Sequence, residues 1–202
     1  MEKALFAPLA WGVVGFPLAL IIYLFSLWRK LKGEYPQNSI ICYSLFTILA
    51  FILAGISAYA LFDGDYFLLA GVIGLAITSI LFSYSNKWNN WYLLESTTPA
   101  VLLSVITFLL GMAFTFAKMI YFIHALFLFI TYLLKNLWNG YRSFAWYHSG
   151  KPGFLFLAPL AVILFLESGL AFYLTNGLYW RSLLLGLSSL GVGAIIFIRS
   201  KK

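Results

Sequence analysis

The stretch from Pro99 to Leu134, PAVLLSVITFLLGMAFTFAKMIYFIHALFLFITYLL, contains one lysine, one histidine and no acidic residue. A transmembrane helix needs about 20 predominantly apolar residues. The stretch is therefore too long for one membrane-spanning helix and has a suitable length for two. We expect a tight turn near Lys118, where the ammonium group can reach the lipid headgroups from the end of a helix.

The composition of the chain excludes a soluble globular protein. Hydrophobic residues make up 63% and charged residues 9% of the 202 residues, and the mean hydropathy is +0.95. A soluble domain carries roughly 25% charged residues. We therefore predict an all-α integral membrane protein. The single cysteine, Cys42, excludes a disulfide framework and a multi-cysteine metal site, and we expect it to pack within its apolar run.

The apolar runs and the polar residues between them predict seven transmembrane helices that form one domain, residues 1–202. The first run is too long for a cleaved signal peptide and has no small-residue cleavage site before the sequence RKLK. The expected helices are Ala4–Trp28, Ser39–Phe62, Tyr66–Tyr84, two within Pro99–Leu134, Phe154–Thr175 and Leu178–Ile198.

The distribution of basic residues predicts the orientation. Cytoplasmic loops of membrane proteins carry an excess of Lys and Arg. With seven spans and the N-terminus outside, 10 of the 13 basic residues lie on the cytoplasmic side together with the C-terminus, and Lys3, Lys118 and Arg181 lie outside. The cytoplasmic set is Arg29, Lys30, Lys32, Lys87, Lys135, Arg142, Lys151, Arg199, Lys201 and Lys202.

Ionisable groups inside a membrane are costly and are therefore candidates for function. Glu167, in FLESGLAF, is the only acid inside a predicted span, and His124 lies about a turn and a half beyond Lys118. Each is either a functional group or a side chain that is hydrogen-bonded between helices. The sequence has no Ser/His/Asp set, phosphate loop or paired histidines, and we expect neither a metal nor another cofactor, nor a nucleic-acid partner.

The loop NGYRSFAWYHSGKPG, residues 139–153, mixes basic and aromatic side chains. Aromatic rings settle at the level of the headgroups and cations are attracted to anionic lipid. The loop is therefore either a simple interfacial anchor or a site for a phospholipid headgroup or a partner. Its basic members are Arg142, His148 and Lys151, its aromatic members are Tyr141, Phe144, Trp146 and Tyr147, and Trp88, Trp91 and Tyr92 of the preceding cytoplasmic loop would extend the belt.

Several motifs, taken in order, resemble the prolipoprotein diacylglyceryl transferase family of bacterial membrane enzymes. LAGISAYALF resembles the family's G-A-R-L-G-Y-V-L-F with Tyr59 in place, and LAGVIG resembles H-G-G-L-L-G with Gly71 and Gly74 in place. LLESTTPAVLL resembles L-D-x-x-A-P-A-L with Glu95 for the aspartate, and TFLLGMAF falls on G-R-I-G-N-F with Gly111 in place. KPGFLF followed by FLESGLAF resembles P-G-L-L-F and R-F-x-x-E-F. The resemblance covers most of the chain.

The chain departs from the family at most of the family's polar positions. The family's histidine falls on Leu69, and the arginine and asparagine of its signature fall on Leu109 and Met112. The outer head of the family, between its fourth and fifth helices, is reduced to the turn at Lys118. The closing N-G-E of the signature falls on Thr115, Phe116 and Ala117, and the late arginine and glutamate fall on Glu167 and Ala171.

The resemblance implies a bacterial inner-membrane protein that transfers diacylglyceryl from phosphatidylglycerol to a lipobox cysteine, with phosphatidylglycerol and prolipoprotein signal segments as partners. That chemistry needs a base for the thiol and cations for the leaving phosphate. Two hypotheses follow: a transferase that uses other groups, or a non-catalytic lipid-binding scaffold or subunit; a small transporter is less favoured. The candidate lipid- or substrate-binding residues are Tyr59, Gly71, Gly74, Glu95, Gly111, His124, Arg142, Lys151 and Glu167.

Overall fold

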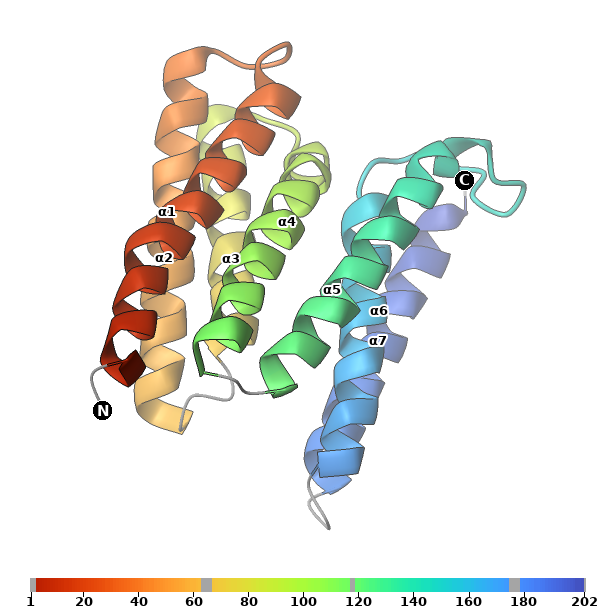
Figure 1. Cartoon of the computed structure of the whole chain (residues 1–202). Helices are drawn as coiled ribbons and strands as arrows, with labels where there is room; N and C mark the ends of the chain where they lie inside the picture. Colours follow the sequence, from red (N-terminus) through yellow and green to blue (C-terminus); the bar gives the residue numbers. More distant parts are fainter. Residues whose placement is uncertain (1–2, 63–66, 117–118, 175–178, 202) are drawn as a thin grey trace. The chain divides into compact units, whose positions relative to one another are not determined.

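The computed structural model describes residues 3–62, 67–116, 119–174 and 179–201 (Figure 1). Within these ranges the chain forms seven α-helices and one 3-10 helix, η1, and no strand. The predicted all-α class is confirmed. The elements are α1 (Lys3–Leu31), α2 (Gln37–Phe62), α3 (Phe67–Asn86), α4 (Asn90–Phe116), α5 (Met119–Leu137), η1 (Trp138–Ser143), α6 (Phe154–Leu174) and α7 (Tyr179–Ser200).

Five helices within the described ranges are long and apolar enough to cross a bilayer. A helix satisfies its own backbone hydrogen bonds, which is the condition for crossing hydrocarbon. The protein is therefore a membrane protein by the length and composition of its helices. The candidate spans are Gln37–Ala58, Asn90–Phe114, Met119–Ser143, Phe154–Tyr173 and Ser182–Ser200, and Ala70–Asn86 is a shorter apolar helix.

The long apolar stretch that begins at Pro99 forms parts of two helices, as predicted. Helix α4 ends at Phe116 and α5 begins at Met119. Lys118, at which we expected the turn, lies outside the described residues. The connection is short because the chain has only two residues, 117 and 118, between the helices.

The predicted start of the fourth helix is wrong. Helix α4 begins at Asn90, and Pro99 lies inside it as a buried residue. The side-chain oxygen of Asn89 accepts a hydrogen bond from the backbone N–H of Tyr92 at 3.1 Å. This bond satisfies one of the amides that have no partner in the first turn of a helix.

The earlier start of α4 changes the count of acids in apolar helices. Glu95 lies in α4 within the candidate span Asn90–Phe114. Glu167 is therefore not the only acid in such a span, contrary to the sequence-based expectation. Trp91 and Tyr92 also belong to α4 and not to a loop.

The chain divides into two compact units, and we describe each by itself. The first, which we call the α2–α3 unit, is Leu24–Thr97. The second, the α5–α7 unit, comprises Met1–Tyr23 and Thr98–Lys202. The divisions fall inside α1 and α4, so these two helices contribute residues to both units.

Glycines let α2 and α3 pack closely. A Cβ atom on Gly74 would lie 2.7 Å from the Cβ of Ala54 and 2.8 Å from the carbonyl oxygen of Ala50. A Cβ on Gly71 would lie 2.8 Å from the ring of Phe51. Small residues allow close approach of helix backbones where lipid gives no hydrophobic drive for association. The two glycines that we selected as site candidates thus have a packing role.

Serines join α6 to α7, which run side by side in Figure 1. Ser168 Oγ donates to the carbonyl of Ser182 and Ser182 Oγ donates to the carbonyl of Ser168, both at 2.8 Å. About two turns away, Ser189 Oγ donates to the carbonyl of Ala161 at 2.8 Å. Cys42 lies in the apolar helix α2 and is exposed there.

Replacing Gly74 with Ala should destabilise the α2–α3 packing. The new methyl group would have to displace the α2 backbone at Ala50, and such overpacking costs about 1–3 kcal/mol. Unfolding in detergent, followed by circular dichroism, measures the change. Gly191→Ala is the matched control, because a Cβ at Gly191 meets no atom within 4 Å. Equal stability of the two variants would contradict the packing role.

Candidate functional site

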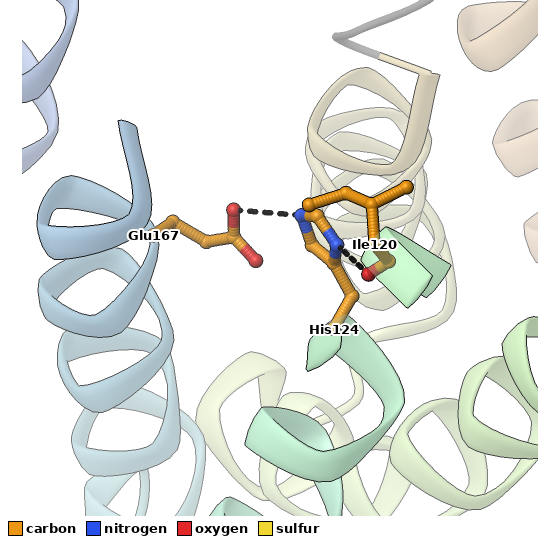
Figure 2. A network of polar contacts seen from close by, with 3 residues as sticks. All are labelled: Ile120, His124 and Glu167. Carbon is orange, nitrogen blue, oxygen red and sulfur yellow. Dashed lines mark hydrogen bonds and ion pairs between the residues drawn. The ribbon is translucent and has the colours of Figure 1, made fainter. Parts of the chain in front are cut away.

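His124 and Glu167 form a polar contact between α5 and α6. The Nε2 atom of His124 lies 3.1 Å from Oε2 of Glu167, and its Nδ1 atom lies 2.7 Å from the carbonyl oxygen of Ile120. Figure 2 shows the ring between these two oxygens. The structure thus brings together the two ionisable residues that the sequence singled out separately.

The contact lies near one end of its helices. His124 comes five residues after Met119, where α5 begins, and Glu167 comes seven residues before Leu174, where α6 ends. At 1.5 Å of rise per residue these offsets are about 8 Å and about 10 Å. The pair is therefore within the apolar helices but closer to the end at which α6 leads to α7 than to the end with the α5–α6 loop.

The neighbouring surface is an apolar groove. Phe127 contributes from α5 and Ser182 from α7, and α6 supplies the remaining wall. The side chains of His124 and Glu167 are 24% and 27% exposed, so the pair is partly covered. The α6 residues that line the groove are Phe165, Leu166, Ser168, Gly169, Leu170, Phe172 and Tyr173.

The hydrogen bonds of His124 limit its chemistry. A general base for a thiol needs a ring nitrogen that can reach the thiol proton. In this structure one nitrogen faces the backbone carbonyl of Ile120 and the other faces Glu167. The ring is therefore held as a bridge between helices and presents neither nitrogen to a substrate.

The loop between α5 and α6 is built on a compact aromatic cluster. Tyr141, Tyr147 and Phe154 are buried. The Tyr141 and Phe154 rings are stacked with centroids 5.0 Å apart, and Tyr147 meets them at 5.3 Å and 5.2 Å. Aromatic pairs at such distances add about 0.5–1.5 kcal/mol each beyond the area that they bury. The loop thus packs on the start of α6 through a shared hydrophobic cluster.

The same loop is joined to the C-terminal end of α7. The backbone N–H of Ser149 donates to the carbonyl of Ser200 at 3.1 Å, and its hydroxyl donates to the carbonyl of Arg199. Arg199 Nη2 in turn donates to the carbonyl of Pro152 at 2.6 Å. The last carbonyls of a helix have no partner within the helix. Ser149 supplies partners to two of these carbonyls.

Cationic side chains surround this joined end. Arg142 is exposed, and its Nε donates to the hydroxyl of Tyr141 at 3.3 Å. Lys151 is exposed, and the Lys201 ammonium lies 4.5 Å from the centre of the Phe197 ring. Trp146, in the same loop, is 50% exposed. The predicted basic–aromatic loop is therefore an ordered surface with accessible cations.

The other residues selected from the sequence are distributed over both units. Glu95 is half-buried in the α2–α3 unit and Gly111 is buried in the α5–α7 unit. Of the positions where the family that the sequence motifs resemble has polar groups, Leu109 and Ala171 are buried and Met112 is half-buried. The side chains of Tyr59, Leu69, Thr115, Phe116 and Ala117 lie outside the described residues.

Sequence analysis missed a buried hydroxyl network in the α2–α3 unit. The hydroxyl of Tyr43 lies 2.7 Å from Ser79 Oγ and 2.9 Å from Thr97 Oγ1, which joins α2 to α3 and to the start of α4. Ser79 and Thr97 also contact the carbonyls of Leu75 and Leu93 at 2.8 Å and 2.7 Å. Hydroxyl groups in otherwise apolar helices were the available signal, but the sequence does not indicate which of them meet.

Aromatic and basic residues also gather at the turns of the α2–α3 unit. The rings of Tyr35 and Trp88 stack with centroids 3.8 Å apart, and the Lys32 ammonium lies 4.6 Å from the Trp28 ring. Burial, followed by the nearby Tyr92 and Glu34, raises the pKa of Tyr35 above its usual value. The predicted aromatic belt therefore has a counterpart in this unit.

No family model, curated protein or solved structure matches this chain. The resemblance to the diacylglyceryl transferase family rests on the sequence motifs alone.

Replacing Tyr43 with Phe should destabilise the α2–α3 unit. The change removes the hydroxyl that joins Ser79 to Thr97. Hydrogen bonds between membrane helices contribute about 0.6 kcal/mol on average and up to about 1.7, so we expect a loss in this range in denaturation experiments in detergent. Tyr84→Phe is the control, because Tyr84 is 89% exposed. A loss no greater than that of the control would show that the network adds no stability.

Proposed function

We propose that this chain is a multi-pass protein of the bacterial inner membrane that binds anionic phospholipid and does not catalyse diacylglyceryl transfer. The observation that carries the proposal is the ordered α5–α6 loop, which presents Arg142 and Lys151 to the surroundings and is joined to the end of α7. The ligand class is a phosphate-bearing lipid headgroup.

The charge of this part of the chain supports an anionic ligand. Between residues 119 and 202 the sequence contains one acid, Glu167. Glu167 lies 13 residues along α6 from Phe154, a distance of about 20 Å. The cations of the loop are therefore far from the carboxylate of their own helices. Each Lys or Arg near an anionic membrane surface contributes about 1 kcal/mol of attraction.

The aromatic part of the loop supports a position at the membrane interface. Trp and Tyr are enriched at the level of the headgroups because their rings are apolar and their N–H or O–H groups are polar. Tyr147 donates its hydroxyl to the carbonyl of Lys151 at 2.9 Å. The bond fixes the backbone of a basic residue against the aromatic cluster, so a headgroup would meet an arrangement that is already ordered.

We further propose seven spans with the N-terminus outside and the C-terminus in the cytoplasm. The placement of 10 of the 13 basic residues on the predicted cytoplasmic side supports this orientation. The contact of Ser149 with Ser200 supports a common side for the α5–α6 loop and the end of α7, because it keeps the two together. Two crossings between them, by α6 and α7, are compatible with this contact and with the proposed seven spans.

The resemblance to the transferase family supports the same ligand, since the donor lipid of that family is phosphatidylglycerol. It does not supply the chemistry. Leu69 and Leu109 stand where a histidine and an arginine would act, and neither can take a proton or hold a phosphate. His124, the histidine of the apolar helices, bridges Ile120 and Glu167. A transferase that uses other groups is the alternative.

Reconstitution of the protein in nanodiscs that contain phosphatidylglycerol tests the proposal. The measured quantity is the enrichment of phosphatidylglycerol bound to the protein, determined by mass spectrometry. Arg142→Gln combined with Lys151→Gln should remove two cations and about 2 kcal/mol, which corresponds to a loss of roughly 30-fold in lipid affinity. Added salt should weaken wild-type binding in the same direction.

The matched control changes two exposed lysines of the α2–α3 unit, Lys32→Gln and Lys87→Gln. This variant has the same net charge as the loop variant but retains Arg142 and Lys151. If the two double variants show the same loss of lipid affinity, lipid binding depends on net charge and not on the loop, and the proposed site is wrong.

Cysteine labelling in intact cells tests the orientation. In a Cys42→Ser background, a cysteine at Lys118 should react with a membrane-impermeant reagent from outside. A cysteine at His148, which is exposed in the α5–α6 loop, should react only after the cells are opened. Labelling of both positions from the same side would contradict the proposed seven spans.

A further inference from the structure

The proton count of the His124–Glu167 contact follows from its geometry. A backbone carbonyl can only accept a hydrogen bond, so Nδ1 of His124 must carry a proton to bind the carbonyl of Ile120 at 2.7 Å. A second proton must then lie between Nε2 and the carboxyl oxygen of Glu167, which are 3.1 Å apart. It resides either on the carboxyl of a neutral pair or on the ring of an ion pair.

Both of these forms have zero net charge, and the forms with one proton more or fewer do not. Without the shared proton, a nitrogen lone pair faces a carboxylate, and the pair is repulsive and negative. With an additional proton, the pair is a cation. A net charge in an apolar environment is costly. The contact is therefore favourable only while it holds one shared proton.

The titratable and charged residues nearest to the pair along each helix are the groups that could respond to such a change. On α5 the titratable neighbour one turn away is Tyr121, and on α6 the titratable neighbour towards the helix end is Tyr173. On α7 the charged residue beside Ser182, which binds Ser168, is Arg181. The α4 segment 98–116 has no Asp, Glu, Lys, Arg, His, Tyr or Cys. The other charged residues that the predicted topology places on this side are Glu2, Lys3, Asp63, Asp65 and Lys118.

The contact also lies where it can hold a helix in place. Helix α6 is joined to α7 by the reciprocal hydrogen bonds of Ser168 and Ser182. Helix α5 packs directly against α6, and η1 and the loop add further contacts at one end. The His124–Glu167 contact lies towards the opposite end of α5, next to the apolar groove that Phe127 and Phe172 line.

We propose that His124 and Glu167 form a proton-binding site within the membrane, and that the shared proton keeps this end of α5 attached to α6. Loss of the proton, or gain of a second one, separates the helix ends and widens the groove beside them. The inference is independent of the lipid-binding loop, because it concerns the opposite end of the helices.

Distance measurements between spin labels at Met119 and Tyr173 test the proposal. Both residues are exposed, at 70% and 81%, and lie at the end of α5 and α6 nearest to the pair. In a Cys42→Ser background in nanodiscs, the distance should be shortest at intermediate pH. It should lengthen towards both limits of a range from about pH 3 to about pH 10, which brackets the titration of isolated Glu and His side chains.

Glu167→Gln is the decisive variant. Its amide can donate to Nε2 of His124 but has no proton to lose near neutral or alkaline pH. We therefore expect the variant to retain the short distance and to lose the lengthening at alkaline pH. Glu34→Gln removes an exposed acid from the turn before α2 and should keep the complete wild-type profile.

Two results would overturn the proposal. The first is a wild-type distance that does not change over the whole pH range, which requires no variant. The second is an alkaline lengthening in Glu167→Gln that equals the wild-type change, because another group would then be responsible.

Discussion

Hydrocarbon offers no water to a polar group that loses its partner, and this constraint accounts for most of the side-chain hydrogen bonds in the structure. Single hydroxyl groups bond to a carbonyl of their own helix, as Ser44 does with Ile40 at 2.7 Å and Thr131 does with Phe127 at 2.8 Å. Hydroxyl groups that face another helix bond across the interface, as Tyr43 and Ser168 do. His124 and Glu167 follow the same rule with ionisable groups.

The same constraint gives the polar groups of the chain different roles within the helices and at the helix ends. Within the helices, the polar groups described above bond to a carbonyl of their own helix or join one helix to another. At the helix ends, where headgroups and water are available, cations and aromatic rings are exposed, as at Arg142 and Trp146. Recognition of an anionic lipid fits the second region. It needs positive charge on an ordered surface and no proton transfer.

Much of the fold could be predicted from the sequence because apolar length is a local property. The division of the stretch after Pro99 into two helices followed from its length alone. The start of α4 at Asn90 was missed because polar residues such as Glu95 indicated a loop, whereas Asn89 binds the backbone of the first turn and the helix continues through Pro99. Local polarity was a poor guide because the helix end depends on backbone hydrogen bonding.

The sites were less predictable because they depend on contacts between distant residues. His124 and Glu167 were identified individually by their cost inside a membrane, but their pairing over 43 positions required the structure. Gly71 and Gly74 were selected by resemblance to a family motif, whereas the structure places them against Phe51 and Ala54. The capping of α7 by Ser149 left no local signal in either segment.

The central claim is that the chain binds anionic phospholipid without acting on it. The most direct test is a diacylglyceryl transfer assay with the wild-type protein in nanodiscs of phosphatidylglycerol and a lipobox peptide, with empty nanodiscs for comparison. The account predicts lipidated peptide at the level of empty nanodiscs, together with retention of phosphatidylglycerol by the protein. Repeated turnover above that level, abolished by Glu167→Gln, would contradict it and show that residues other than the family's polar set perform the transfer.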